Sequence, residues 1–335
     1  MTAKIVIAGA GSIGCYVGGC LALAGKTVTF LARGRVAAAL ARDGLRVTDL
    51  DGRDHRFAAG SLSVEIDPAN ALSSADIVLV TVKSGATLDM AGLVDRYAPS
   101  AAVVISLQNG VENASRIAAA FATPRTVLAG MVPFNVVLTE RAGEPLRVHR
   151  ATAGHILVES GKADLVAALS VEGLPVETCA DMKSVLWGKL LLNLNNALNA
   201  LSDKPLKVEL SDGRWRKLLA VQMEEALAAM RAASIQPAKL AGVSPTLLPT
   251  ILRLPDWLFS RVARRMLAID PQARSSMWED LVHHRATEID EFQGAILRLA
   301  AAAGTQAPVT ERVIARIRDA ERKNAGPPAL EPDAV

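Results

Sequence analysis

Residues 4–14 read KIVIAGAGSIG, a short β-branched run followed by glycines with the spacing G-x-G-x-x-G. A helical apolar pattern follows and ends near Gly25, so the segment predicts a strand, a tight turn and a helix. In that context the first glycine makes the turn, the second lets the backbone approach a pyrophosphate, and the third lets the helix pack on the strand. The N–H groups at the helix start can then bind phosphates. The expected dinucleotide-binding residues are Gly9, Ala10, Gly11, Ser12, Ile13 and Gly14. The alternative is a purely structural glycine-rich turn.

The second predicted strand, residues 27–31, is followed by the tetrapeptide ARGR at 32–35. Proteins that bind NAD usually place an Asp or Glu here to hold the ribose 2′-hydroxyl, but this chain has no carboxylate before Asp43. Because the guanidinium fork of arginine matches phosphate geometry, Arg33, with Arg35 as a helper, favours the 2′-phosphate of NADP(H). The alternative is that both arginines are solvated surface residues.

Length and composition restrict the class of protein. The 335 residues are 50% hydrophobic and 21% charged, which suits two packed domains. The net charge of +3 includes no long basic run and only 4% of residues are aromatic, so a nucleic-acid partner is not indicated. The three cysteines form neither a metal-binding cluster nor a disulfide framework, which fits a reducing compartment. The glycine-punctuated start does not read as a signal peptide, and no segment is long and apolar enough to span a membrane. We therefore expect a soluble, cytoplasmic protein without a metal or a membrane partner.

Further strands place polar residues at strand ends. Residues 45–66 alternate polar and apolar as short strands do, and Asp67-Pro68 is typical of a helix start. Two buried-strand patterns, residues 76–82 and 102–106, then lead to Lys83 and Asn109. Ligands of doubly wound sheets bind beyond the carboxyl ends of strands, so both residues are candidates for cofactor or substrate contacts. Either could also be an ordinary turn residue.

The character of the chain changes near residue 180. Residues 127–159 are strand-like and predict a sheet extension that closes the first domain, whereas helical periodicity dominates from residue 181. Helices are expected near 208–235, 245–268, 276–302 and 308–323. We therefore predict an α/β chain with an N-terminal Rossmann-type dinucleotide-binding domain over residues 1–180 and an all-helical C-terminal domain over 181–325. The last ten residues, GPPALEPDAV, should form a loose tail.

One predicted helix, WGKLLLNLNNALNAL over residues 187–201, is apolar on most faces but carries a cation and several amides. At about 100° per residue, Lys189, Asn193 and Asn196 fall within an arc of about 60°, with leucines on the other sides. Such a helix belongs in an interior, where unpartnered ammonium or amide groups are costly. The polar stripe therefore indicates a binding site. The alternative is a core helix whose asparagines satisfy nearby backbone and whose lysine extends to solvent.

Two further residues in the helical half are candidates. The segment SMWE over residues 276–279 has the pattern of a capping box, so Ser276 is expected to begin a helix. Glu288 lies among apolar neighbours in the segment TEID. It is either an exposed helix residue or a partner for Lys189.

Five features together resemble the ketopantoate reductase (2-dehydropantoate 2-reductase) family over nearly the whole chain. They are GAGSIG at 9–14, the lysine of TVKS at 81–84, LQNG at 107–110, KLLLNLNNALNAL at 189–201, and SSM at 275–277 followed by the glutamate of TEID. The resemblance implies a Rossmann domain, an all-helical C-terminal domain, and an active site in the cleft between them.

The resemblance also implies roles for individual residues. It makes Lys189 the proton donor and Glu288 a carboxylate that contacts the lysine side of the site and the cofactor ribose. It assigns Asn193, Asn196 and Ser276 to the keto acid, Asn109 to cofactor and substrate, and Lys83 and the backbone near Val136 to NADPH.

This sequence departs from the family pattern at two positions. The second asparagine of the lysine helix is often eight residues after the lysine, whereas Asn196 is seven after Lys189, which requires a one-residue slip or a local bulge. Some members also place a substrate-binding asparagine where Leu206 stands here.

The predicted activity is NADPH-dependent reduction of ketopantoate to pantoate in pantothenate and coenzyme A biosynthesis, with Lys189 stabilising the alkoxide and protonating it. The alternatives are a related reductase of another 2-keto acid or an imine, and a noncatalytic NADPH sensor. A sensor would not need a cation, two amides and a carboxylate in one site. The presence of Lys189, two asparagines and Glu288 therefore favours an enzyme. The expected partner is a small 2-keto acid, and the sequence leaves a homodimer open.

Overall fold

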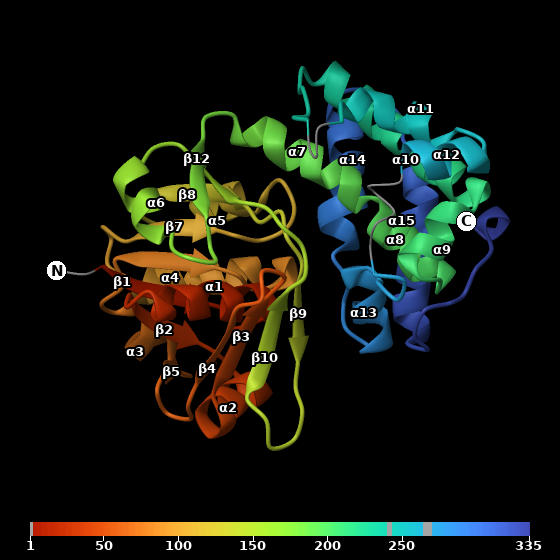
Figure 1. The fold of residues 1–335 in the computed structure, drawn as a ribbon. Coiled ribbons are helices and arrows are strands. Elements are labelled where there is room, and N and C mark those ends of the chain that lie inside the picture. Colours follow the sequence, from red (N-terminus) through yellow and green to blue (C-terminus); the bar gives the residue numbers. More distant parts are fainter. Residues whose placement is uncertain (1–2, 240–242, 264–269) are drawn as a thin grey trace. The chain divides into compact units, whose positions relative to one another are not determined.

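The computed structural model describes residues 3–239, 243–263 and 270–335. It divides into two compact units, residues 1–182 and 183–335, the first built on β-sheets and the second on helices (Figure 1). The division falls in the first turn of helix α7 (Met182–Asn193), two residues beyond the boundary expected at residue 180. No helix in the described part of the chain is long and apolar enough to cross a membrane.

An eight-stranded sheet forms the centre of unit 1, in the order β12-β11-β8-β7-β6-β1-β2-β5. Its strands are β1 (Lys4–Ala8), β2 (Thr27–Leu31), β5 (Ser63–Glu65), β6 (Ile77–Val80), β7 (Val103–Ser106), β8 (Val127–Met131), β11 (Ile156–Glu159) and β12 (Val176–Cys179). The strands from β5 to β8 are parallel, and β11 pairs antiparallel with β8. The chain runs from β1 to β2 on one side and later places β6 on the other, so the strand order reverses beside β1. In doubly wound sheets this is the point at which ligands bind.

Each face of the large sheet has its own apolar core. In β1, Ile5 and Ile7 join one cluster while Val6 and Ala8 join the other, because neighbouring residues of a strand point to opposite faces. Burial on both faces explains why these strands read as continuous apolar runs. The first cluster includes residues of α1 (Ser12–Leu23) and α6 (Ala163–Leu169). The second includes residues of α3 (Pro68–Leu72), α4 (Thr87–Tyr97) and α5 (Asn113–Ala120).

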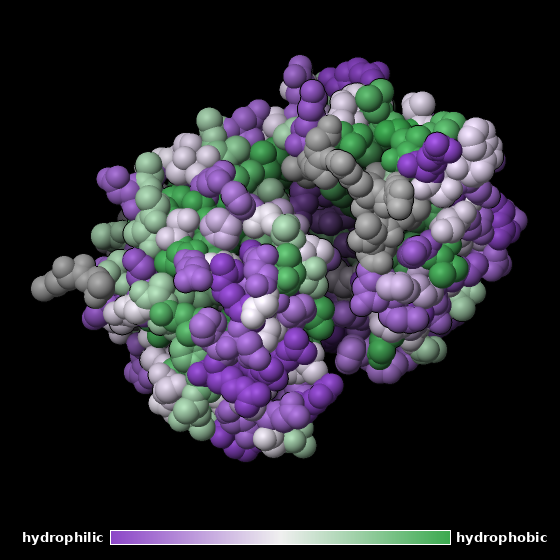
Figure 2. All heavy atoms as spheres, in the orientation of Figure 1, coloured by the Kyte–Doolittle hydropathy of each residue, from purple (hydrophilic) through white to green (hydrophobic). Residues whose placement is uncertain are grey.

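A second sheet in unit 1 differs from the expectation. Its four strands, in the order β4-β3-β10-β9, are β3 (Leu45–Asp49), β4 (Asp54–Phe57), β9 (Val136–Thr139) and β10 (Leu146–Arg150). The prediction that residues 127–159 extend the sheet is confirmed for β8 and β11. It is wrong for β9 and β10, which leave the large sheet, and β10 pairs with β3. Strand β4 exposes its polar side chains, and Figure 2 shows a hydrophilic surface over this part of unit 1.

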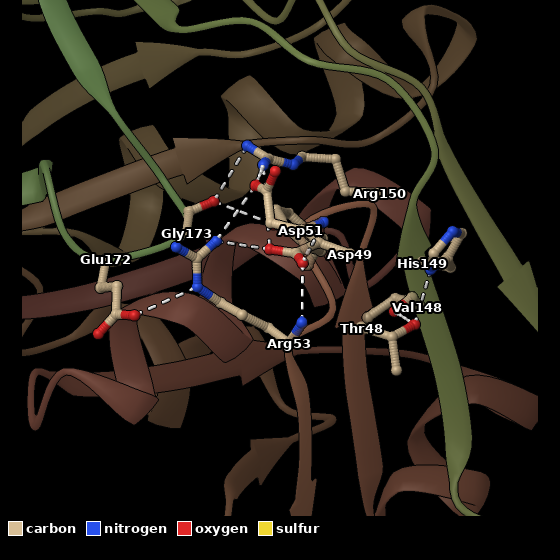
Figure 3. Close-up of polar contacts among 10 residues, drawn as sticks. Thr48, Asp49, Asp51, Arg53, Val148, His149, Arg150, Glu172 and Gly173 are labelled. Atoms are coloured by element: carbon tan, nitrogen blue, oxygen red, sulfur yellow. Dashed lines mark hydrogen bonds and ion pairs between the residues drawn. The ribbon is translucent and has the colours of Figure 1, made fainter.

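A cluster of charged side chains joins the ends of β3 and β10 to the loop before β12 (Figure 3). Arg53 Nη1 lies 2.7 Å from Asp49 Oδ2, and Arg150 Nη2 lies 2.7 Å from Asp51 Oδ2. Arg150 is buried, and its guanidinium also donates to the carbonyl of Gly173. Arg150 also lies 3.9 Å from Asp49, and both side chains are buried, so losing either one would leave an uncompensated charge. The cluster therefore ties the small sheet to the loop.

No β-strand lies in the described residues of unit 2, which consists of helices joined by turns and loops. The helices after α7 are α8 (Asn195–Ser202), α9 (Leu206–Ser211), α10 (Gly213–Ala232), α11 (Leu248–Leu252), α12 (Asp256–Val262), α13 (Ser276–Val282), α14 (Ile289–Ala302) and α15 (Pro308–Lys323). Short 3₁₀ turns are η1 (Ser84–Ala86) in unit 1, and η2 (Pro245–Leu247) and η3 (Pro332–Ala334) in unit 2.

Three of the long helices that the sequence predicts are interrupted. The helix near 208–235 is divided at Asp212, whose side chain caps α10 by accepting from Arg214 N. The helix near 245–268 consists of short pieces up to residue 263, and its last residues lie outside the described part. The helix near 276–302 is two helices separated by residues 283–288. Capping side chains and turns divide these segments although their apolar periodicity continues.

The last ten residues contradict the expectation of a loose tail. Leu330 N donates to Leu201 O at 2.8 Å, and Arg312 Nε donates to the carbonyl of Val335. Glu331 forms ion pairs with Lys204 and with Arg214, each at 3.1 Å. The segment is therefore held by backbone and charge contacts, which an apolar periodicity does not reveal.

Candidate active site

The glycine turn of residues 9–14 lies where the strand order reverses. Gly9 has φ = +116°, and a Cβ there would lie 2.7 Å from the backbone nitrogen of Val82. A Cβ on Gly14 would collide with the carbonyl of Gly9, so this glycine lets α1 pack directly on the turn. Gly11 differs, because nothing lies within 4 Å of the position of its Cβ. The turn therefore needs its first and third glycines for folding and leaves open space at the second.

The start of α1 has the properties of a phosphate site. Gly11 is the N-cap and has no side chain to bind the first N–H groups of the helix, and the first turn holds no acidic residue. Ala10 is buried beneath the turn, whereas Ser12 and Ile13 are half-buried at its surface. Unsatisfied N–H groups and the positive end of the helix dipole attract anions. The residues present therefore fit the pyrophosphate of a dinucleotide.

Two arginines follow β2. Arg33 is the exposed N-cap residue of α2 (Gly34–Asp43), and its backbone is extended. Arg35 Nε lies 3.0 Å from Glu140 Oε2, so Arg35, the expected helper, already pairs with a carboxylate. Arg33 makes no ion pair with any residue that the structure describes. Arg33 is thus the stronger candidate for contact with a phosphate group.

Lys83 and Asn109 lie at the same edge of the large sheet, because they follow the parallel strands β6 and β7. Lys83 is exposed and precedes the turn η1, whereas Asn109 is half-buried. The glycine turn borders this region, since the missing Cβ of Gly9 faces Val82. The structure therefore brings Lys83 to the edge on which the glycine turn lies.

A chain of buried polar side chains that the sequence analysis missed holds these two loops together. Gln108 Nε2 donates to Val82 O at 3.0 Å and to Thr87 Oγ1 at 2.7 Å. Thr87 Oγ1 donates to Asn113 Oδ1 at 3.0 Å, and Asn113 Nδ2 donates to the carbonyl of Asn109. Asn113, four residues after Asn109, was the signal available in the sequence. This network holds the backbone next to Lys83 and at Asn109 in place.

Val136 is the first residue of β9 and belongs to the small sheet. It is half-buried and packs against the apolar cluster on which Ile13 of the glycine turn also packs. The expected contact between its backbone and the cofactor remains a prediction.

In unit 2, the helix expected around Lys189 is interrupted. Helix α7 ends at Asn193 and α8 begins at Asn195. The carbonyl of Leu194 accepts a hydrogen bond from Gln293 Nε2 at 2.9 Å, and a side chain that inserts into the hydrogen-bond ladder can break a helix. The interruption lies between Asn193 and Asn196, where the asparagine spacing requires a slip or a bulge.

The polar stripe persists across this interruption. Its three members are half-buried, namely Lys189, Asn193 and Asn196. The leucines on the other sides are at most 2% exposed, namely Leu190, Leu191, Leu194 and Leu198. The apolar faces thus form the core of unit 2, while the polar groups stay partly accessible.

Electrostatic interaction links Lys189 with Glu288. Burial lowers the pKa of Lys189 to about 8, because the ammonium loses water, and the negative charge of Glu288 opposes this shift. Glu288 is the half-buried N-cap residue of α14. A lysine with a pKa near 8 can give up a proton close to neutral pH, which suits a general acid.

Ser276 begins α13, as expected, but the capping role that the capping-box pattern gave it belongs to the residue before it. The N-cap of α13 is Ser275, whose Oγ accepts from Trp278 N at 3.1 Å. Ser275 is 4% exposed, whereas Ser276 is the exposed first residue of the helix. The pattern is shifted by one residue because the buried Ser275 hydroxyl also donates to the carbonyl of Asn196 at 3.0 Å. The hydroxyl of Ser276 is therefore not needed for capping.

Comparison with known proteins identifies one family along the chain. The family model for ketopantoate reductase PanE/ApbA matches residues 5–162, and the model for its C-terminal part matches residues 181–321. A 2-dehydropantoate 2-reductase of Halobacterium salinarum is 30% identical over 332 residues, which cover 95% of this chain and 99% of that protein.

Two solved structures have the same architecture. A PanE/ApbA family ketopantoate reductase from Ralstonia eutropha is 31% identical, with a TM-score of 0.80 over 96% of this chain and 99% of that one. D-mandelate dehydrogenase, solved with NADH and anilino(oxo)acetate, is 19% identical, with a TM-score of 0.77 over 96% and 99% of the two chains. At that identity the second structure shows a shared fold only.

Proposed function

Because the chain belongs to the ketopantoate reductase family and is an oxidoreductase, we propose that it uses NADPH to reduce ketopantoate to pantoate, a step of pantothenate and coenzyme A biosynthesis. One observation carries most of the proposal. Lys189 is a half-buried lysine whose pKa is lowered to about 8, it interacts with Glu288, and it shares a polar stripe with Asn193 and Asn196.

The residues of unit 2 would perform the acid chemistry and bind the keto acid. When bound, NADPH supplies the hydride that reduces the C2 ketone. Lys189 Nζ would stabilise the negative charge that develops on the ketone oxygen and then give that oxygen its proton. Glu288 would favour the charged form of the lysine. The substrate's carboxylate and hydroxyl would be bound by Asn193, Asn196 and Ser276.

The residues of unit 1 would hold the cofactor. The first turn of α1 would bind the pyrophosphate, since Gly11 leaves open space there. Arg33 would bind the 2′-phosphate, which distinguishes NADPH from NADH. Lys83, Asn109 and the backbone near Val136 would complete the nucleotide contacts, with Asn109 also reaching the substrate.

A reductase of a simpler 2-keto acid is the second candidate, and Leu206 favours it. Leu206 N donates to Ala273 O at 2.9 Å, so this apolar residue is tied to the segment that leads into Ser276. Some family members have an asparagine at the corresponding position. An apolar side chain there would weaken recognition of a substrate hydroxyl.

The test compares two substrates that differ in one group. Ketopantoate has a hydroxymethyl group that 2-ketoisovalerate lacks, and both are assayed by NADPH oxidation at saturating cofactor. A site built to bind a hydroxyl leaves polar groups unpaired with the analogue, so kcat/KM should favour ketopantoate by roughly two orders of magnitude or more.

The matched variant is Leu206→Asn, which introduces the asparagine that some family members have at this position. If Leu206 limits recognition, this variant should raise the ratio further. A ratio near one in the parent would favour the second candidate. No oxidation with either acid would refute the proposed activity.

A further inference from the structure

Two residues proposed to bind the keto acid come from distant parts of the chain. Asn196 lies on α8, and Ser276 opens α13 eighty residues later. A substrate held by both requires a fixed distance between these helices. The structure contains a hydrogen-bonded centre that joins them, built on Asn199.

Asn199 is fully buried and uses its whole amide. Its Oδ1 accepts from Ser275 N at 2.9 Å, and its Nδ2 donates to Lys204 O at 2.9 Å and to Glu209 Oε2 at 2.7 Å. The orientation of the amide is unambiguous, because Ser275 N can only donate and Lys204 O can only accept. Asn199 therefore connects α8, α9 and the start of α13.

Ser275 supplies a second link between the same helices. Its Oγ donates to the carbonyl of Asn196 at 3.0 Å while accepting from Trp278 N. The residue before Ser276 is thus bound to α8 at two positions three residues apart, Asn196 and Asn199. Two bonds at separate points restrict rotation as well as distance, which a single bond would not.

Glu209, on α9, accepts a hydrogen bond from the side chain of Asn199. This residue is fully buried, and burial raises the pKa of its carboxyl to about 8, although hydrogen bonds from Asn199 and Asn195 and the charge of Lys204 oppose the shift. Among the described atoms, Glu209 Oε1 and Asn195 Oδ1 have no hydrogen-bond partner. A protonated Glu209 can donate to an amide oxygen, so a neutral carboxyl suits this place better than an anion.

We propose that Asn199, held by Glu209, is a positioning residue that fixes Ser276 relative to Asn196 and so sets the geometry of keto acid binding. The inference rests on the proposed function, since it presumes that these two residues contact the substrate. A buried hydrogen-bonded residue could also act on stability alone. The two roles differ in whether KM for the keto acid changes apart from the melting temperature.

The experiment compares variants in steady-state assays with ketopantoate and 2-ketoisovalerate, in NADPH titrations and in thermal unfolding. Asn199→Ala removes the centre, and Ser275→Ala removes only the hydroxyl link and the cap of α13. Asp212→Ala is the matched control, because it removes the side-chain cap of α10 in the same unit. Glu209→Gln keeps the shape of an uncharged, hydrogen-bonding side chain, whereas Glu209→Ala removes the side chain that binds Asn199.

For a positioning role, Asn199→Ala should raise KM for the keto acid roughly tenfold to a hundredfold. Ser275→Ala should raise it roughly three- to tenfold, the worth of a hydrogen bond. Asp212→Ala should lower the melting temperature like Ser275→Ala and leave KM unchanged. Glu209→Gln should keep the parent's KM, and Glu209→Ala should behave like Asn199→Ala. NADPH affinity should stay constant throughout, because the proposed cofactor contacts of these helices do not include the altered residues.

Several results would overturn the inference. If Ser275→Ala and Asp212→Ala lower the melting temperature alike and neither changes KM, the network acts on stability alone. This comparison also decides the matter if Asn199→Ala does not fold. An active parent whose variants keep its KM refutes only the inference. A parent that reduces neither acid refutes the proposed function, and the inference falls with it.

Discussion

The glycine turn of unit 1 and the polar stripe of unit 2 are built in different ways. In the turn, the proposed cofactor site consists of backbone and of space free of side chains, as the positive φ of Gly9 and the open space at Gly11 indicate. In the stripe, the side chains of Lys189, Asn193 and Asn196 form the proposed site, and buried groups from elsewhere in unit 2 bind the backbone beside them. The first kind of site is local in sequence, whereas the second depends on tertiary contacts.

This difference separates binding from chemistry. A backbone site tolerates few side chains but holds any ligand with the right phosphate geometry. A side-chain site can place one cation in a partly dehydrated environment and shift its pKa. Substitutions in the turn should therefore act on cofactor affinity, and substitutions in the stripe on turnover.

The largest effect is expected for Lys189→Ala, which removes the cation that we propose as the proton donor. Turnover should fall by roughly 10² to 10⁴, while NADPH affinity measured by fluorescence titration should stay close to the parent's. In the parent, activity should decline as the pH rises above about 8, because the lysine loses the proton it must donate. A variant that keeps half of the parent's rate would remove Lys189 from the mechanism and would show that the stripe does not carry the chemistry.

The next effect tests whether the turn acts through space alone. Gly11→Ala should fold normally, since no atom lies near the added methyl group, but the methyl would occupy the place of the pyrophosphate. Crowding of this kind costs about 1–3 kcal/mol, so NADPH affinity should fall roughly 5- to 150-fold. Gly14→Ala is the contrasting variant, because its methyl group would collide with the Gly9 carbonyl and lower the melting temperature instead. Equal stability and equal affinity in both variants would contradict this account.

A smaller effect is expected from Arg33, which follows β2 and is proposed to bind the 2′-phosphate on the ribose. The parent should prefer NADPH over NADH by about an order of magnitude or more in kcat/KM, because an arginine stands where NAD-binding proteins carry an acid. Arg33→Asp should erode that preference. Arg35→Ala serves as the control, since Arg35 pairs with Glu140, and it should change the preference less. Equal kcat/KM values for the two cofactors in the parent would rule out this role of Arg33.

The smallest expected effect is on the pH dependence of stability and comes from Glu209, which binds Asn199 in the same unit as the polar stripe. Burial raises the pKa of Glu209 from 4.5 to about 8, so the folded state favours the protonated carboxyl. The contribution of Glu209 to the free energy of unfolding is therefore fully present below about pH 4.5, and it is lost as the pH rises to about 8. Relative to Glu209→Gln, the parent's free energy of unfolding should fall over this window by at most about 1.4 kcal/mol per pH unit. Urea denaturation near pH 5, 6 and 7 measures it, below the range in which Lys189, with a pKa of about 8, loses its charge. Parallel curves for the two proteins would show that Glu209 does not titrate there.

The parts of the fold that could be predicted are those with a local cause. Strands β1 and β2 have the predicted bounds, and Asp67 caps α3 as its position before Pro68 indicated. The second sheet could not be predicted, because β10 pairs with β3, which lies about a hundred residues earlier in the chain. Both regions are rich in strand-forming residues, and nothing in such a pattern specifies the partner.

Spacing along one strand or one helix was enough to predict the glycine turn, the change from a sheet-forming to a helical half, and the polar stripe, because each of these features is local in the chain. Tertiary contacts were needed to show that Ser275 rather than Ser276 caps α13, that Gln293 binds the carbonyl of Leu194 where α7 ends, and that Asn199 joins α8 to α13. Buried polar groups must find hydrogen-bond partners, and those partners come from segments that are distant in sequence. The pattern of one segment can show that a polar residue needs a partner, but the folded chain decides which residue that is.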